Sequence, residues 1–403
     1  MKKRKRNNRD KLPSANIKVV GIGGGGGNAV TRMVKDFPRG VDFVAINTDH
    51  QDLDQCVARR KIYIGRNLTR GLGTGMNPDL GRQAAEENRS DIAEALEGAD
   101  LVFIAAGLGG GTGTGASPIV AEVAKQIGAL ALAFVTKPFA FEGSQRSRIA
   151  QEGLIKLKDK VDALVVVPND RIFNIISKET PIIEAFEAID DVLKNALRGI
   201  VELIVTPGLI NVDFADVRSV VQDAGSAIVG LGIGSGEDRA ANAVNQALNS
   251  PLLETSVEGA RGILLGISGS RKLGMNDINE VAKMVAQIAD PSARIIFGAY
   301  YDRHLRANQL KVTLIATGFD GGVPASSLFS SSFRERESKQ PSFFGSSEIK
   351  GQPRLEGVSS GKGNSSKTSP AESQPLKKSE PVETKKKDND IWDIPTFLRK
   401  KRK

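Results

Sequence analysis

Two glycine-rich segments are the residues of this 403-residue chain whose types and spacing most directly indicate chemistry. Residues 21–28 have the sequence G-I-G-G-G-G-G-N, and residues 107–115 have the sequence G-L-G-G-G-T-G-T-G. Glycine lets backbone N–H groups approach an anion closely, and a helix that starts there adds a positive dipole end. The two segments therefore predict a site for phosphate groups.

The first segment alone leaves two kinds of protein open. Dinucleotide-binding enzymes also carry its G-x-G-x-x-G pattern, followed about 20 residues later by an acid that binds ribose. Asp49 lies 23 residues after Gly26, so a nicotinamide-dependent oxidoreductase is an alternative. The second segment favours a nucleotide with several phosphates instead. Because the chain has no P-loop lysine, neutralisation of the phosphates is expected from backbone dipoles and from Mg²⁺.

Both segments follow a predicted strand and precede a predicted helix. Apolar runs predict strands at residues 17–21, 41–46, 101–106, 129–136 and 163–167, and helices are expected at 28–36, 90–96 and 118–127. Pro118 would lie in the first turn of the last helix. Strands that alternate with helices predict an α/β fold with a parallel, wound sheet.

A long helix is predicted from Pro181 to the stop signal Pro207-Gly208, because apolar residues recur there every three or four positions. It is expected to join two domains, although an ordinary core helix would have the same stripe. The expected organisation is a basic arm at 1–16, a nucleotide-binding domain at 17–180, this helix at 181–208, a second α/β domain at 209–320, a disordered linker at 321–389, and a docking peptide with a basic tail at 390–403.

Composition narrows the class of protein. Cys56 is the only cysteine, which excludes an intramolecular disulfide. No run of about 18 apolar residues predicts a membrane-spanning helix, and no signal peptide is recognisable, so the cytoplasm is the expected compartment. The net charge of +9 lies in the tails and leaves −4 for residues 17–330, which argues against a specific nucleic-acid partner. The basic tails could touch anionic lipid or simply be solvated.

Further motifs occur in a fixed order along the chain. Residues 109–115 match the signature [SAG]-G-G-T-G-[SAT]-G of the tubulin superfamily. Because N-T-D at 47–49 and N-V-D-F-A-D at 211–216 accompany this signature, the chain resembles the FtsZ family, the bacterial cell-division GTPases of that superfamily. The resemblance covers about residues 17–320 and resumes at 390–399. It implies a tubulin-like fold, with GTP or GDP as the nucleotide.

The resemblance also implies which residues would bind GTP. Those around the phosphates would be Gly24, Gly25, Gly26, Gly27, Asn28, Asn47, Asp49, Gly110, Gly111, Thr112, Gly113 and Thr114. A loop that senses the γ-phosphate would contain Gly71, Gly73 and Gly75.

On the sugar and base, Glu142 and Arg146 would contact the ribose side, although their spacing also suits a surface ion pair. Asn169, Phe186 and Asp190 would hold guanine. A carboxylate can accept from the N1–H and amine of guanine, a donor pair that adenine lacks. Asp191 next to Asp190 leaves open which of the two carboxylates turns inward.

Asn211, Asp213 and Asp216 match the family's catalytic loop, which enters the nucleotide site of the next subunit. The carboxylates would orient the attacking water, so hydrolysis would depend on head-to-tail assembly into filaments. Taken alone, D-x-x-D more often caps a helix. A structural homologue that binds nucleotide without hydrolysing it is a third possibility.

The end of the chain resembles the family's tail, which docks on membrane tethers and division regulators. Its anchors would be Ile394, Pro395, Phe397 and Leu398, and a random apolar stretch is the alternative. The implied function is a GTPase that polymerises into the cytokinetic ring, in the cytoplasm at the division site on the inner face of the cell membrane.

Overall fold

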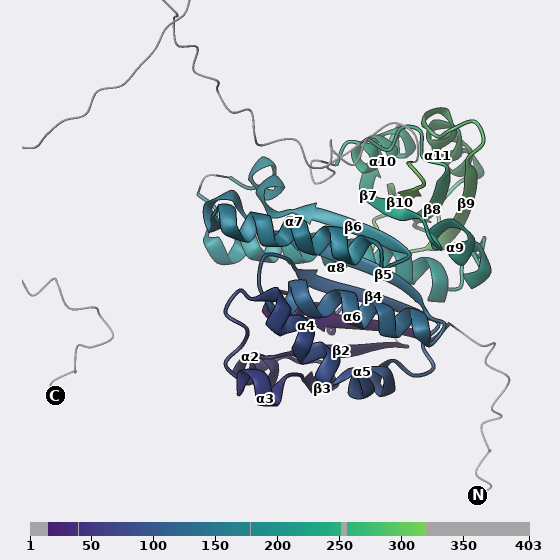
Figure 1. Cartoon of the computed structure of the whole chain (residues 1–403). Coiled ribbons are helices and arrows are strands. Elements are labelled where there is room, and N and C mark those ends of the chain that lie inside the picture. Colours follow the sequence, from purple (N-terminus) through teal and green to yellow (C-terminus); the bar gives the residue numbers. More distant parts are fainter. Residues whose placement is uncertain (1–14, 39, 178, 251–255, 320–403) are drawn as a thin grey trace, which may run out of the picture. The chain divides into compact units, whose positions relative to one another are not determined.

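The computed structural model describes residues 15–38, 40–177, 179–250 and 256–319 (Figure 1). Most of the predicted basic arm, the linker and the docking peptide with Ile394, Pro395, Phe397 and Leu398 lie outside these residues. No helix within the described ranges is long and apolar enough to cross a membrane.

Strands and helices alternate through the first half of the chain, as the sequence predicts. The strands are β1 (Ile17–Ile22), β2 (Val41–Asn47), β3 (Arg60–Tyr63), β4 (Leu101–Gly107), β5 (Leu130–Lys137), β6 (Ala163–Pro168), β7 (Gly225–Ser235), β8 (Gly262–Gly269), β9 (Arg294–Tyr301) and β10 (Gln309–Thr317). The helices are α1 (Gly23–Met33), α2 (His50–Gln55), α3 (Arg66–Thr69), α4 (Pro78–Glu87), α5 (Arg89–Leu96), α6 (Thr112–Gln126), α7 (Ser144–Lys158), α8 (Ile182–Val205), α9 (Phe214–Val221), α10 (Arg239–Leu248) and α11 (Met275–Ile288). Two short 3-10 helices are η1 (Ala140–Glu142) and η2 (Asn169–Asn174).

The first six strands form a parallel sheet in the order β3-β2-β1-β4-β5-β6, which confirms the predicted α/β fold. Alternate residues of β1 face two different cores: Val19 packs in one, and Val20 packs in the other. A strand buried on both faces explains the continuous apolar runs in the sequence. Strand order reverses between β1 and β4, and ligands bind at such a point in wound sheets.

The remaining strands continue the same sheet as β7-β10-β8-β9. Here β10 runs antiparallel to both β7 and β8, whereas β8 and β9 are parallel. The two halves are joined by two parallel residue pairs, Ala163 with Gly225 and Leu164 with Ser226. The second half is therefore an α/β domain with a mixed sheet.

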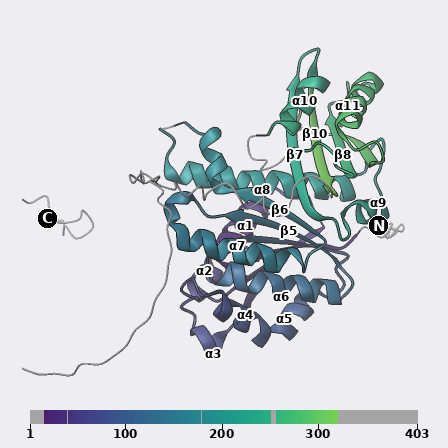
Figure 2. The same ribbon diagram turned by 45° about the horizontal axis from the view of Figure 1, so that its top comes forward.

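Helix α8 has 24 residues and is the longest helix in the described part of the chain. Pro181 precedes it, as the sequence predicts, and Thr206 ends it. One apolar core contains Leu197 of α8, Phe103 of β4 and Tyr300 of β9. Helix α8 lies against α1 and η2 of the first half and against β7 and β10 of the second half, and Figure 2 shows it between the parallel sheet and β7 and β10.

Candidate nucleotide-binding site

The two glycine segments meet at the reversal point of the sheet. Ile22 at the end of β1 lies beside Ala106 near the end of β4, so both segments leave the sheet at the same edge. A Cβ atom placed on Gly23 would stand only 3.0 Å from the backbone nitrogen of Gly113. We refer to residues 23–28 and 108–114 together as the cradle.

Most of the first segment is helix rather than loop. Helix α1 begins at Gly23, five residues earlier than the start expected at residue 28. The later start was expected because glycine has low helix propensity. It was wrong because close packing against the sheet outweighs that propensity here. A Cβ on Gly26 would overlap the carbonyl oxygen of Ala105 in β4, so only glycine lets α1 lie so close to the sheet.

The second segment differs from its prediction in the same way. Helix α6 begins at Thr112, and Pro118 lies inside it instead of in its first turn. Residues 112–121 are all buried, and a Cβ on Gly115 would overlap the carbonyl oxygen of Pro78 in the neighbouring α4. Burial on nearly every side thus stabilises a helix that glycine and proline would otherwise disfavour.

Neither cradle helix has a side-chain cap. Ile22 before α1 and Gly111 before α6 make no side-chain hydrogen bond to the first turn. The first N–H groups of two neighbouring helices are therefore left to an anion, and both helix dipoles favour negative charge there. This arrangement suits a polyphosphate.

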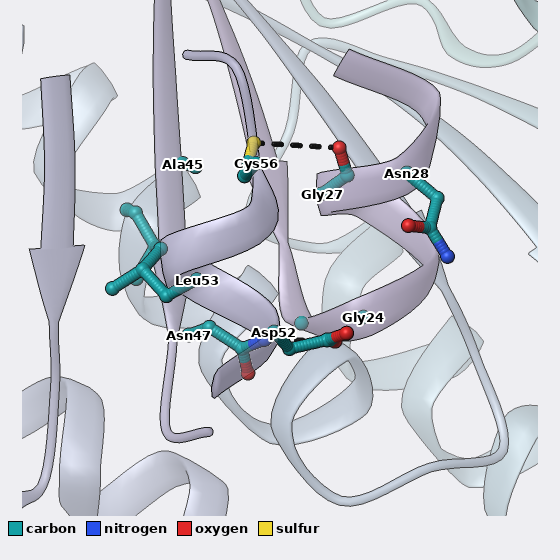
Figure 3. A pocket seen from close by; sticks show the side chains of 10 residues that line it. Gly24, Gly27, Asn28, Ala45, Asn47, Asp52, Leu53 and Cys56 are labelled. Atoms are coloured by element: carbon teal, nitrogen blue, oxygen red, sulfur yellow. Dashed lines mark hydrogen bonds between the residues drawn. The ribbon is translucent and has the colours of Figure 1, made fainter. Parts of the chain in front are cut away.

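A pocket opens beside the cradle between α1 and α2 (Figure 3). It is lined by the predicted Gly24, Gly27, Asn28 and Asn47 and by three residues that sequence reasoning missed, Asp52, Leu53 and Cys56. The Cys56 thiol points at the Gly27 carbonyl oxygen, with 3.5 Å between sulfur and oxygen. Asp52 lies so near Gly24 that a Cβ there would be 2.6 Å from its carboxylate.

The predicted Asn47 and Asp49 organise the turn into α2. Asn47 Oδ1 accepts hydrogen bonds from the backbone nitrogens of Thr48 (2.8 Å) and Asp49 (3.2 Å). Asp49 caps α2 by accepting from the nitrogen of Asp52 at 3.1 Å. The carboxylates of Asp49 and Asp52 are the oxygen ligands that Mg²⁺ prefers. The described residues contain no group of three or more His, Cys, Asp or Glu side chains that could hold a metal. Asp49 and Asp52 would supply carboxylate oxygens to a Mg²⁺ ion bound together with the phosphates.

The predicted sensing loop with Gly71, Gly73 and Gly75 lies against this turn. All three glycines have positive φ angles, which side chains other than glycine rarely adopt. The nitrogen of His50 donates to the Gly71 carbonyl at 3.2 Å, and Leu72 forms a bridge with Asp49. The structure thus brings this loop to the phosphate side of the site.

The predicted sugar-side pair lies beside the cradle. Glu142 and Arg146 form an ion pair with each other, which is the arrangement that their spacing alone favours. Glu142 also accepts from the nitrogen of Phe139 at 2.9 Å. The backbone of Arg146 passes next to Gly109, which places the pair at the second glycine segment.

The predicted base pocket contains one acceptor without a partner. Asn169 begins η2, and its Oδ1 atom is buried without a hydrogen bond from any described residue. A buried acceptor of this kind costs free energy unless a ligand or water satisfies it. Phe186 is 44% exposed and packs edge-on against Phe139, at 5.7 Å between ring centroids. Its ring is available for stacking.

Asp190 and Asp191 have different environments. The Asp190 side chain is only 17% exposed and forms an ion pair with Arg32 of α1, whereas Asp191 is 55% exposed and pairs with Lys194 at 2.6 Å. Burial raises the pKa of Asp190 to about 6, Arg32 opposes this, and the negative charges of Asp191 and Glu187 add to it. Asp190 is therefore the carboxylate that turns inward.

Asn211, Asp213 and Asp216 are not brought to the cradle of their own chain. Asp213 caps α9 by accepting from the nitrogen of Asp216 at 2.7 Å, and Asn211 accepts from the nitrogen of Gly208 at 2.7 Å. These bonds fit the capping alternative. The loop follows the C-terminal end of α8, while Asp190 lies in its N-terminal half. In both views α2 and α9 lie on opposite sides (Figures 1 and 2).

Comparison with known proteins identifies the family. The profile of the Tubulin/FtsZ family GTPase domain matches residues 16–177, and that of the FtsZ family C-terminal domain matches residues 225–320. A solved FtsZ dimer from M. jannaschii is 48% identical with a TM-score of 0.72, over 76% of this chain and 89% of that chain. The chain belongs to the FtsZ family.

A CetZ2 structure from Haloferax volcanii, a protofilament with GTPγS bound, is 21% identical. Its TM-score is 0.63 over 75% of this chain and 92% of that chain, so it shares the fold. The FtsZ-family GTPase profile spans both glycine segments, so the cradle belongs to a guanine-nucleotide domain. The nicotinamide alternative thereby loses its basis.

Proposed function

We propose that this FtsZ-family protein hydrolyses GTP in a site shared by adjacent subunits of a head-to-tail filament. The observation that carries the proposal is the separation of binding groups and catalytic carboxylates along α8. From Asp190 to the end of the helix at Val205 are 15 residues, or about 22 Å at 1.5 Å per residue. One chain cannot bring Asp213 and Asp216 to its own cradle without rearranging its core.

A second copy supplies what one chain lacks. Stacked head to tail, the 211–216 loop of one subunit faces the cradle of the next. Such a contact uses two different surfaces and leaves both ends free, so it generates open filaments. The related M. jannaschii protein was solved as a dimer, which supports self-association.

Each group has a distinct part in the reaction. The cradle N–H groups bind the phosphates, Asn169 and Asp190 accept from guanine, and Phe186 stacks on the base. Across the subunit boundary, Asp213 and Asp216 orient the attacking water, which is most of what phosphoryl transfer requires. Mg²⁺ beside Asp49 and Asp52 would neutralise phosphate charge when bound.

In the cell, the filaments form the cytokinetic ring in the cytoplasm, at the division site on the inner face of the membrane. The peptide with Ile394, Pro395, Phe397 and Leu398 docks on membrane tethers and division regulators. The basic tails contribute weak contact with anionic lipid.

Dilution tests the shared site. Phosphate release from GTP is measured against protein concentration with Mg²⁺ present. Activity should be absent below a threshold concentration and rise linearly above it. Constant specific activity down to high dilution would mean that one chain holds the whole site.

Mixing variants assigns the two halves of the site. Asp213→Ala should lose turnover and keep GTP affinity. Asp238→Ala, which removes another exposed aspartate of the second domain, is the control and should keep both turnover and GTP affinity. A variant with Gly27→Arg should lose GTP binding and keep an intact 211–216 loop. An equal mixture of Asp213→Ala and Gly27→Arg should recover activity, because one supplies the cradle and the other the carboxylates. A mixture as inactive as its parts contradicts catalysis across the boundary.

A further inference from the structure

Three buried threonine hydroxyls meet at the start of α6. Thr48 follows β2, Thr74 belongs to the sensing loop, and Thr112 is the first residue of α6. The oxygen of Thr112 lies 2.6 Å from that of Thr48 and 3.2 Å from that of Thr74. Thr48 is fully buried and the other two are 8% exposed, so all three are shielded from bulk water.

The hydroxyl protons outnumber the contacts between the oxygens. Each hydroxyl carries one proton and can accept two hydrogen bonds, and three hydroxyls share two contacts. Either oxygen of each pair can be the donor, and the Thr112 oxygen, which contacts both partners, can accept from Thr48 and from Thr74. With both donating to it, the proton of Thr112 has no acceptor among the residues that the structure describes.

The position of Thr112 directs that free proton to the cradle. A Cβ on Gly23 would be 3.4 Å from the Cβ of Thr112. The side chain of Thr112, the first residue of α6, therefore lies against the first glycine segment. We propose that Thr48 and Thr74 are positioning residues that orient the Thr112 hydroxyl to donate to a nucleotide phosphate. The inference rests on the proposed GTP site and adds two residues to it.

The same contact anchors the sensing loop. Leu72 of this loop is 84% exposed, whereas Thr74 is buried, so Thr74 fixes an otherwise exposed segment to α6. Arg70 and Met76 on either side have positive φ angles, at 52° and 65°. A phosphate that engages Thr112 therefore acts directly on a buried contact between this loop and the helix.

Threonine variants of the full chain test the proposal by calorimetric titration with GTP. Valine keeps the shape of threonine without its hydroxyl, and serine keeps the hydroxyl without the methyl group. Thr48→Val should weaken GTP affinity about tenfold and Thr74→Val about threefold, in the order of the two distances. Thr48→Ser and Thr74→Ser should retain most of the affinity. Thr313→Val, at a buried threonine of β10, is the matched control and should leave GTP affinity unchanged.

A double-mutant cycle separates positioning from packing. In a Thr112→Val background, Thr48→Val should have no further effect on affinity, because it acts only through the Thr112 hydroxyl. Serine variants as weak as the valine variants, full additivity in the cycle, or valine variants with wild-type affinity would each overturn the proposal. Absence of GTP binding by the wild-type chain would instead remove the proposed function on which it rests.

Discussion

Different kinds of groups lie at the two ends of α8. Near its N-terminal half lies the cradle, where backbone N–H groups of two uncapped helices converge and glycines allow close approach. Beyond its C-terminal end lies the 211–216 loop, which holds the proposed catalytic carboxylates of the exposed Asp213 and the half-buried Asp216. In the proposed function, binding therefore depends on the course of the backbone, and hydrolysis depends on the positions of a few side chains.

The cradle and the 211–216 loop are also held in place by different interactions. The cradle is fixed by buried packing between helices and strands. The 211–216 loop is held by hydrogen bonds to the edge strand β9: the nitrogen of Leu209 donates to the Ala299 carbonyl at 2.7 Å, and the nitrogen of Ala299 donates to the Ile210 carbonyl at 3.0 Å. Substitutions should consequently have separable effects at the two ends.

Gly26→Ala should have the largest effect. The added methyl group would overlap the Ala105 carbonyl, so α1 must move off the sheet, at a cost of about 3 kcal/mol in the free energy of unfolding, and GTP binding should be lost. Gly27→Ala is the matched control, because no atom lies within 4 Å of its new Cβ. It should fold at least as stably, since alanine favours helix over glycine by about 1 kcal/mol. Chemical denaturation measures both, and equal stability of the two variants would contradict the packing argument.

Gly208→Ala should impair the other end. Its methyl group would overlap the Ala299 carbonyl, which pushes the 211–216 loop away from β9. A displacement of about 1 Å at reacting groups lowers kcat on the order of 100-fold, and GTP affinity should not change. Steady-state turnover and equilibrium titration together test this. A parallel loss of GTP affinity would mean that the two ends are not separable.

Acid should weaken GTP binding through Asp190. Its pKa of about 6 means that lowering the pH from 7 to 5 protonates most of the carboxyl and removes an acceptor for guanine, so affinity should fall up to about tenfold. For the ligand-free fold the sign is opposite: a pKa raised above the unfolded value means that this group's contribution to stability is present at low pH and is lost as pH rises through 6. Titrations at several pH values measure the binding effect. Asp190→Asn should flatten the profile, and an unchanged pH dependence in that variant would assign it to another group.

Phe186→Leu should have the smallest effect. Leucine retains apolar contact and removes the ring that stacks on the base, a loss of about 1 kcal/mol or roughly fivefold in GTP affinity. Phe173→Leu is the matched control, since that ring is 55% exposed and also contacts Phe139. Equal losses in both variants would indicate a general effect on the aromatic cluster.

Much of the first domain could be predicted from sequence. Runs such as Leu101 to Ala106 predict strands buried on both faces, and the strand-glycine-helix order locates the cradle. The starts of α1 and α6 could not be predicted, because they depend on overlaps between glycine Cβ positions and carbonyl groups of distant strands and helices. The antiparallel pairing of β10 could not be predicted either, because the direction of pairing depends on how the segments between the later strands connect them.

The site could be predicted where a motif fixes the backbone geometry. It could not be predicted where two similar neighbouring residues were alternatives for the same position. Asp190 and Asp191 are adjacent in sequence, and only the packing of α8 on α1 directs one to Arg32 and the other to Lys194. Asp52 belongs to no motif. Thr48 and Thr74 lie within the N-T-D and 71–75 segments, but only their closeness to Thr112 of α6 indicates a role for their hydroxyls. The roles assigned to the predicted binding and catalytic residues remain predictions until the titrations are done.

The apolar core that α8 shares with both domains has a consequence for folding. Because Phe103, Leu197 and Tyr300 belong to one cluster, neither half can expose its face of α8 without opening the core of the other. Thermal melting should therefore proceed as a single cooperative transition, and a fragment that stops before α8 would expose apolar surface and aggregate. The two halves are distinct in topology and inseparable in stability.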